Sequence, residues 1–431
     1  MKHLVILVLI SSFLIFGCIG IEEIISEPTT FSLNGTIKSV NGDAIPNAKI
    51  EMISNKTYFT YSDDNGFYKF SNLTQGSYKI RITKEGYKDY NISFIFYPGS
   101  YDWNFTLVKD CLYYEIPTKR DYLVIYGYNG TLYRTELTCD LPYPENSLLN
   151  ISFDGTKKDI YYIGQNRMVR LSIDNINQKY NSIKFYFLIA LNGTNSIKIF
   201  ERKETTIQEA SSLMQNYLGE RTTTDVSTGK TKKMIDPNNE EIKMIVTDIK
   251  KRVNSDNVWD MARELFIWLK NNTSYFNQGG VDEYVQSPAE MMKSRKGDCD
   301  ELSYLYISLL RSAGIPSRYV EGFLAKENET RFVRHMWVEF YDGEWVPVEV
   351  AGSGKPNNEY DVHFGIESNL HVPVYIDDGT QASFERTGCR YKYYVQKPEV
   401  SNYAYYTSIP FDEAYIAVCS NGERYITHQK E

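Results

Sequence analysis

The sequence predicts a multidomain chain with an all-β N-terminal sandwich, a β-rich middle region and an α+β domain followed by a β-leaning extension. Short runs of β-branched and aromatic residues separated by turn residues fill the first half of the chain, and helical periodicity begins near residue 205. The length of 431 residues allows about three domains of roughly 100–200 residues each. The expected segments are a signal peptide at 1–17, a tether at 18–30, the sandwich at 31–108, the middle region at 109–204, the α+β domain at 205–355 and the extension at 356–431.

The first residues have the pattern of an export segment. Apolar residues run unbroken from Leu4 to Ile10 and again from Phe13 to Phe16, which is short for a membrane span of about 20 residues. Gly17-Cys18 resembles a lipoprotein processing site, and cleavage there would make Cys18 the lipidated first residue. The alternative is an uncleaved signal anchor that continues to Ile21. Both alternatives place the protein outside the cytoplasm, anchored to the cell membrane.

Residues 31–108 alternate between short strands and turns. Asn41-Gly42 and Asp64-Asn65-Gly66 predict hairpin turns. The pattern is carried by the runs Leu33–Ile37, Ala44–Ile50, Thr60–Phe70, Leu73–Ile80 and Lys84–Tyr87. Together they resemble the carboxypeptidase regulatory-like domain, a small β-sandwich. The resemblance implies a spacer or binding module without chemistry of its own.

The middle region, 109–204, continues the β-rich pattern and resembles no family that we can name. Alternating runs at Tyr122–Tyr126, Asp159–Ile163 and Ile183–Ala190 predict a second sandwich or an accessory sheet. The polar stretch Gly219–Asn239 that follows is predicted to be a loop able to fold over a cleft. The extension after residue 356 is expected to complete the sheet of the α+β domain or to form one wall of a groove.

A cysteine at a predicted helix start marks the α+β domain. Gly297 ends the preceding segment, and Asp298 with Glu301 three residues later forms a capping-box pattern. The helix then buries one face through leucines at helical spacing: Leu302, Leu305, Leu309 and Leu310. Cys299 falls in the first turn, where the positive end of the helix dipole favours a thiolate.

Residues 331–350 predict a hairpin around Asp342-Gly343. A two-residue turn would place Glu349 on the apolar face of the hairpin. A three-residue loop, 341–343, with Gly343 left-handed, pairs His335 directly with Glu349 and gathers the apolar residues on the other face. We predict this second register, because it leaves one face fully apolar: Met336, Val338, Phe340, Val346 and Val348.

The region from about Trp259 to Glu349 carries several motif runs, namely Ala262–Leu269, Ser287–Glu290, Gly297–Cys299, Leu309–Val320 and His335–Glu339. They resemble the transglutaminase-like superfamily, which implies a papain-like α+β fold. In that resemblance Cys299 maps to the nucleophile and His335 to the general base. The third residue of the family is usually an aspartate before a proline, whereas here it is Glu349, followed by valine.

The resemblance implies acyl transfer through a thioester on Cys299, without a cofactor. The expected oxyanion donors are the backbone N–H of Cys299 and, from the segment before it, Tyr275 or Asn277. Hydrolysis of peptide or isopeptide amide bonds in a substrate at the cell surface is the favoured function. A protein-crosslinking transglutaminase and a non-catalytic cell-surface binding protein are the alternatives.

Charge, histidine spacing and cysteine count bear on nucleic-acid partners, metal sites and disulfides. A net charge of −8 with no basic block argues against a nucleic-acid partner. The histidines at 335, 363, 371 and 428 lack ligand-like spacing, so no metal site is expected. Export permits disulfides among four cysteines, with Cys111–Cys139 and Cys389–Cys419 as the local pairing and two other connectivities open.

Overall fold

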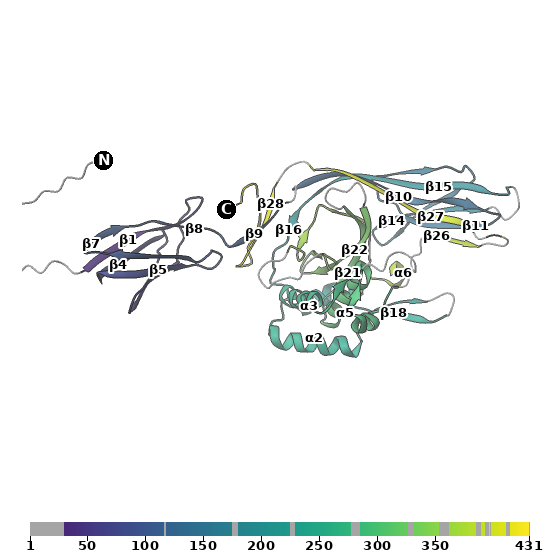
Figure 1. Cartoon of the computed structure of the whole chain (residues 1–431). Coiled ribbons are helices and arrows are strands. Elements are labelled where there is room, and N and C mark those ends of the chain that lie inside the picture. Colours follow the sequence, from purple (N-terminus) through teal and green to yellow (C-terminus); the bar gives the residue numbers. More distant parts are fainter. Residues whose placement is uncertain are drawn as a thin grey trace, which may run out of the picture. The chain divides into compact units, whose positions relative to one another are not determined.

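The computed structural model describes residues 30–430 except 116–117, 175–179, 225–228, 277–284, 326–331, 353–361, 385–388, 393–395, 397 and 411–413. The signal segment, residues 18–29 of the tether and with them Cys18 therefore lie outside the described residues, as does Asn277. The chain divides into two compact units, Met1–Val108 and Lys109–Glu431. Strands predominate in both, and the helices gather in the α+β part of the second unit, which confirms the predicted fold class (Figure 1).

The first unit is a β-sandwich. One sheet has the order β4-β1-β7 with β8 also on β1, and the other has the order β3-β2-β5-β6. Leu33, Ile50 and Ile80 are fully buried between the sheets. The strands are β1 Thr30–Ser39, β2 Lys49–Ile53, β3 Thr57–Tyr61, β4 Phe67–Thr74, β5 Gly76–Thr83, β6 Tyr90–Phe96, β7 Gly99–Asp102 and β8 Phe105–Leu107.

The second unit contains a further pair of four-stranded sheets, ordered β12-β15-β10-β27 and β13-β14-β11-β26. Val124 and Phe187 of one sheet share a buried core with Leu137 and Leu171 of the other. Two of the strands, β26 and β27, come from the C-terminal extension. The strands are β10 Lys119–Leu132, β11 Glu136–Pro142, β12 Ser147–Ile151, β13 Lys157–Ile163, β14 Asn166–Asp174, β15 Ile183–Ser196, β26 Cys389–Lys392 and β27 Glu399–Pro410.

The α+β part packs helices against a sheet of order β23-β22-β21-β25. Figure 1 shows α5 beside β21 and β22. Leu305, Leu309 and Phe340 are fully buried in their common core. The elements are α1 Ile207–Leu213, α2 Glu240–Val253, α3 Val258–Asn272, α4 Pro288–Ser294, α5 Cys299–Ser312, β21 Ser317–Ala325, β22 Phe332–Tyr341, β23 Trp345–Val348 and β25 His371–Ile376.

Short pairings complete the second unit. The stretch Gly219–Asn239, which we predicted to be a loop, contains the hairpin of β17 and β18, so that prediction is wrong. The Lys232 side chain within it donates to the Val285 carbonyl. The remaining elements are β9 Cys111–Glu115, β28 Tyr415–Cys419, β29 Arg424–Thr427, β16 Lys198–Ile199, β24 Ile366–Glu367, β17 Arg221–Thr224, β18 Thr231–Ile235, β19 Ser274–Tyr275, β20 Lys296–Gly297, α6 Gln381–Phe384 and a 3₁₀ turn at Gln215–Tyr217.

A disulfide joins Cys111 in β9 to Cys419 in β28, two strands that pair antiparallel. The local pairing, Cys111–Cys139 and Cys389–Cys419, which was one of three connectivities that the sequence left open, is therefore wrong. Cys139 is disulfide-bonded as well, and the residue opposite it across the β11–β26 ladder is Cys389. The sheet topology decides the pairing, because strands from the two ends of this unit lie side by side.

A buried ion pair joins the end of α5 to the sheet that contains β21 and β25. The Arg311 guanidinium donates to the Ser317 carbonyl at 2.6 Å and to the Asp377 carboxylate at 3.3 Å, and both side chains are fully buried. We expect Arg311→Met to lower the free energy of unfolding by about 3–5 kcal/mol, because it leaves the carboxylate buried and unpaired.

Urea unfolding of wild type and Arg311→Met measures this loss of unfolding free energy, with Arg252→Met on the exposed end of α2 as the matched control. A loss below about 1 kcal/mol for Arg311→Met, within the usual effect of surface substitutions, would contradict the assignment.

Candidate active site

Cys299 is the first residue of α5. Glu301 fixes this helix start, because its buried carboxylate accepts from the Asp298 N–H at 2.8 Å and from the Gln286 N–H at 2.9 Å. Gly297, just before, leaves no room for a side chain, since an added Cβ would lie 2.6 Å from the Met291 sulfur. The first N–H groups of a helix have no partner within the helix, so Cys299 lies where an anion is favoured.

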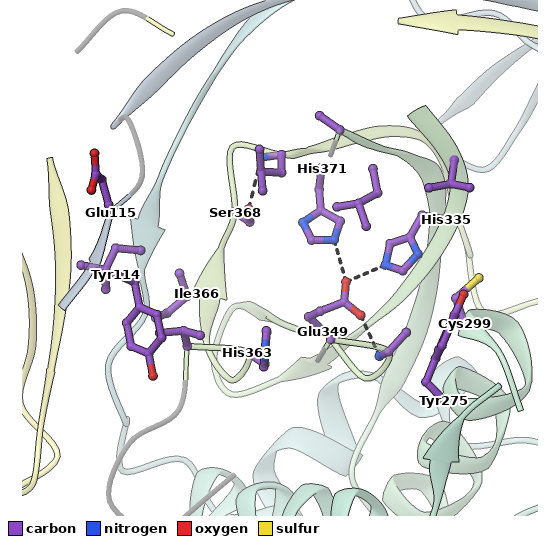
Figure 2. A pocket seen from close by; sticks show the side chains of 18 of the residues that line it. Tyr114, Glu115, Tyr275, Cys299, His335, Glu349, His363, Ile366, Ser368 and His371 are labelled. Atoms are coloured by element: carbon purple, nitrogen blue, oxygen red, sulfur yellow. Dashed lines mark hydrogen bonds and ion pairs between the residues drawn. The ribbon is translucent and has the colours of Figure 1, made fainter. Parts of the chain in front are cut away.

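His335 in β22 and Glu349, just beyond β23, form a short contact. His335 Nε2 donates to Glu349 Oε2 at 2.6 Å. Only Nδ1 then remains for the thiol of Cys299, and the hydrogen bond between Cys299 and His335 raises the pKa of the histidine. Figure 2 shows Cys299 next to His335, with Glu349 on the other side of the imidazole.

The predicted direct pairing of His335 with Glu349 is wrong by two residues. The ladder pairs Phe340 with Val346 rather than with Glu344, so the loop is Asp342–Glu344 rather than 341–343. The buried Asp342 sets this register, because its carboxylate accepts from the Lys203 N–H at 3.1 Å and its own N–H donates to the Glu344 carbonyl at 2.9 Å.

A shift of two residues keeps every side chain on its predicted face. Val338, Phe340, Val346 and Val348 are buried on one face, and Gly343 has the left-handed φ of 74° that we predicted. His335 and Glu349 therefore still share the other face. They meet diagonally instead of directly opposite each other.

His371, the first residue of β25, is the third member of this cluster. His371 Nε2 donates to the same oxygen, Glu349 Oε2, at 2.8 Å, while Glu349 Oε1 accepts from the Ala351 N–H at 2.7 Å (Figure 2). Sequence analysis did not assign His371 a role. Only the antiparallel pairing of β21 with both β22 and β25 brings its side chain here.

The loop after Glu349 is fixed from α3. Lys270, which is buried, donates to the Val350 carbonyl at 3.2 Å and to the Gly352 carbonyl at 2.6 Å. These contacts flank Ala351, whose N–H binds the carboxylate. Lys270 thus holds the backbone that positions Glu349.

Electrostatics favour a charged His335–Glu349 pair. Burial lowers the pKa of His335, but the negative charge of Glu349 and the hydrogen bonds with Cys299 and Glu349 outweigh it and raise this pKa to about 10. Burial likewise opposes ionisation of Glu349, yet the positive His335 and the two imidazole hydrogen bonds hold the pKa of the carboxyl well below its usual range. Burial lowers the pKa of His371, so His371 is the neutral donor at neutral pH.

Tyr275, one of the predicted oxyanion donors, lies beside Cys299. Its strand β19 pairs with β20, which directly precedes Asp298 and Cys299. Burial and the negative charges of Cys299 and Asp298 raise the pKa of Tyr275, so its hydroxyl stays protonated and able to donate. The geometry brings Tyr275 to the site without testing its role.

A cavity of about 730 Å³ opens from these residues, lined by Tyr275, Cys299, His335, Glu349 and His371 among others. Cys299 also lines a second cavity, of about 310 Å³. Cys299, Arg334 and His335 line both cavities. The two cavities therefore meet at Cys299 and His335.

The same cluster has the composition of a metal site. The ligand atoms of His335, Glu349 and His371 lie within 4.8 Å of one another, and so do those of Asp298, Cys299 and Asp300. The spacing argument against metal ligands is therefore wrong for His335 and His371, because different strands bring them together. In the structure both Nε2 atoms of the first cluster are engaged by Glu349.

Comparison with known proteins identifies the fold of this region. Residues 243–350 match the transglutaminase-like superfamily. This confirms the resemblance, and the match contains Cys299, His335 and Glu349. Residues 32–108 match the carboxypeptidase regulatory-like domain, as predicted.

The individual relatives are distant. The uncharacterized protein YebA of Bacillus subtilis (strain 168) is 30% identical over 121 residues, which cover 23% of this chain and 16% of YebA. The structure of a candidate cysteine protease from Cytophaga hutchinsonii aligns at a TM-score of 0.44 with 14% identity, over 74% of this chain and 100% of that one. A candidate protease from Parabacteroides distasonis ATCC 8503 aligns at 0.24 with 11% identity, over 80% and 70%.

The His335–Glu349 pair predicts how stability depends on pH. Because the folded pKa of His335, about 10, lies above its ordinary 6.5, its contribution is complete below about pH 6.5 and is lost as the pH rises through 10. The pKa of Glu349 shifts downward, so its contribution is present above its ordinary 4.5 and is lost as the pH falls through the folded value.

We expect the difference in unfolding free energy between wild type and His335→Leu to shrink from about pH 6 to about pH 10. Urea unfolding at a series of pH values measures it, and the difference removes other groups that titrate equally in both proteins. A difference that does not change with pH would show that His335 is not charged in the folded protein.

The contact of His371 with Glu349 predicts a positioning role. His371→Leu leaves Glu349 Oε2 with one donor, so we expect His335 to lose orientation and alkylation of Cys299 by iodoacetamide at pH 7 to slow by about tenfold. His371→Gln keeps an N–H donor and should restore most of the rate. Equal rates in the Leu and Gln variants would assign His371 a packing role only.

Proposed function

We propose that this protein is a cysteine hydrolase that cleaves peptide or isopeptide amide bonds through Cys299, His335 and Glu349. One observation carries the proposal: a histidine bound by a buried carboxylate lies beside a cysteine at a helix start, within a cavity that can admit substrate. This arrangement has the parts of a thiol acyl-transfer triad, namely a nucleophile, a base and a group that orients the base.

In the proposed first step, His335 holds the proton lost by Cys299, and the thiolate adds to the amide carbonyl carbon. The resulting oxyanion is stabilised by the Cys299 N–H and by the hydroxyl of Tyr275. As the carbon–nitrogen bond breaks, the His335 imidazolium gives its proton to the departing amine. The acyl group remains on Cys299 as a thioester.

In the proposed second step, the neutral His335 takes a proton from water, and the hydroxide adds to the thioester carbonyl. Collapse of this intermediate releases the carboxylic acid and returns the thiolate, with the proton on His335. Glu349 stabilises the imidazolium in both steps, and His371 and Ala351 hold the carboxylate. A lysine amine in place of water would instead form a crosslink.

The location is part of the proposal. The apolar N-terminal run and Cys18 support export followed by anchoring at the cell membrane, and the disulfide between Cys111 and Cys419 suits an oxidising compartment. The substrate would then be a peptide or protein at the cell surface. Among the described residues, no helix combines the length and the apolar composition of a membrane span.

Alkylation of Cys299 tests the chemistry without a known substrate. We expect iodoacetamide to label Cys299 rapidly at about pH 6, because the thiolate is paired with His335, and we expect His335→Ala to slow this at least tenfold. Cys299 is the free cysteine among the described residues, and peptide mapping by mass spectrometry separates its label from any on Cys18.

Cys299→Ala is the control for labelling elsewhere. Slow labelling with the profile of an ordinary thiol in both wild type and His335→Ala would overturn the triad and favour a binding protein. If labelling is fast, cleavage of peptide substrates in the presence of a primary amine separates the reactions. Hydrolysis yields a free acid and crosslinking yields a new amide.

A further inference from the structure

The active-site cavity has an apolar side away from Cys299, formed by Tyr113, Tyr114, Val362, Ile366 and Ile416. We call these five residues the distal wall. Figure 2 shows Cys299 and Tyr275 on one side of the cavity and Tyr114 and Ile366 on the opposite side, with Glu349 and His363 between them. The cavity thus extends from the nucleophile to the distal wall.

The aliphatic part of the distal wall is firmly held. Ile366 is 6% exposed and Ile416 is 4% exposed, and both belong to a small hydrophobic cluster with Ile197 and Val418. Val362 packs against the same cluster. The wall is therefore built before substrate arrives.

Two strands from the ends of the second unit, β9 and β28, carry Tyr113, Tyr114 and Ile416 of the distal wall. Tyr114 of β9 lies directly opposite Ile416 of β28, so the two side chains share one face of the ladder. The Cys111–Cys419 disulfide locks the same ladder at its other end. All five wall residues lie outside residues 243–350, so the family match does not include this surface.

The lining of the larger cavity also separates by polarity. Its charged members outside the His335–Glu349–His371 cluster include Glu115 at the end of β9 and Arg334 beside His335. The distal wall itself offers aliphatic and aromatic surface. At about 730 Å³ the cavity lies within the range of about 300–1,000 Å³ typical of ligand pockets.

The position of Tyr275 indicates where in the larger cavity the carbonyl under attack lies. Tyr275 lines the larger cavity and does not line the smaller one. The carbonyl under attack must lie between Cys299 and its oxyanion donors. The carbonyl under attack therefore lies at the Cys299 end of the larger cavity, and we take the acyl chain attached to it to occupy this cavity.

We propose that the distal wall is a specificity subsite that binds a bulky aliphatic or aromatic side chain on the acyl side of the cleaved amide. The proposal rests on the proposed function, because it takes Cys299 as the nucleophile. It names the substrate class as peptides with an apolar residue close to the bond that is cut. Burial of that side chain against the wall removes apolar surface from water.

Peptidyl chloromethyl ketones test the subsite, because they carry an acyl-side peptide to the cysteine without a known substrate. The panel places Leu, Phe, Glu or Lys one or two residues before the reactive carbon. We expect the Leu and Phe reagents to alkylate Cys299 faster than the Glu and Lys reagents by about tenfold or more, as for other apolar pockets.

A matched pair of variants assigns this preference to the wall. Tyr114 and Tyr186 are both 37% exposed, but Tyr186 lies on β15 and lines neither cavity. Tyr114→Asp should lower the ratio of the alkylation rate with apolar reagents to the rate with charged reagents at least threefold, whereas Tyr186→Asp should keep the wild-type ratio. Circular dichroism of each variant measures the folded fraction, because unfolded chains react alike with each reagent and would lower this ratio without any change at the wall.

The outcomes separate the two proposals. Equal rates across the panel with fast, His335-dependent iodoacetamide labelling would overturn the subsite and leave the hydrolase intact. A preference that Tyr114→Asp and Tyr186→Asp alter equally would also overturn it. Slow iodoacetamide labelling that does not depend on His335 would overturn the proposed function and the subsite together.

Discussion

The buried carboxylate of Glu349 is the constraint on which the candidate site depends. Removing a carboxylate from water costs several kcal/mol, so the surrounding chain must provide donors for it. His335, His371 and the Ala351 N–H do so at 2.6, 2.8 and 2.7 Å. These donors come from β22, β25 and the loop after β23, which means that the sheet must be complete before the carboxylate is satisfied.

The position of Glu349 also depends on the helices, through Lys270 of α3. By binding the carbonyls of Val350 and Gly352, it ties the loop that carries Glu349 to α3. Glu301 does the same for Cys299, because it joins the start of α5 to the segment before α4. Cys299 and Glu349 are therefore positioned by separate elements that share one buried core.

The sequence predicted the local features of this site well, because they depend on short-range chemistry. Gly297, Asp298 and Glu301 predicted the start of α5, and alternation along 331–350 predicted which side chains share a face. The register was wrong by two residues because Asp342 binds the Lys203 backbone, a contact between residues far apart in the chain. The contact of His371 was missed, and the Cys111–Cys419 bond was left open among three connectivities, for the same reason: only the sheet topology brings these residues together.

The central claim is that Glu349 keeps His335 charged while His371 stays neutral on the same oxygen. Nitrogen-15 NMR of the histidine rings, recorded from about pH 5 to about pH 9, tests it directly, with His335→Gln and His371→Gln used to assign the signals. We expect His335 to keep the shifts of an imidazolium across this range, and His371 to show a neutral ring protonated at Nε2 at neutral pH. If His335 loses its proton near its ordinary pKa of 6.5, Glu349 does not hold the pair as described.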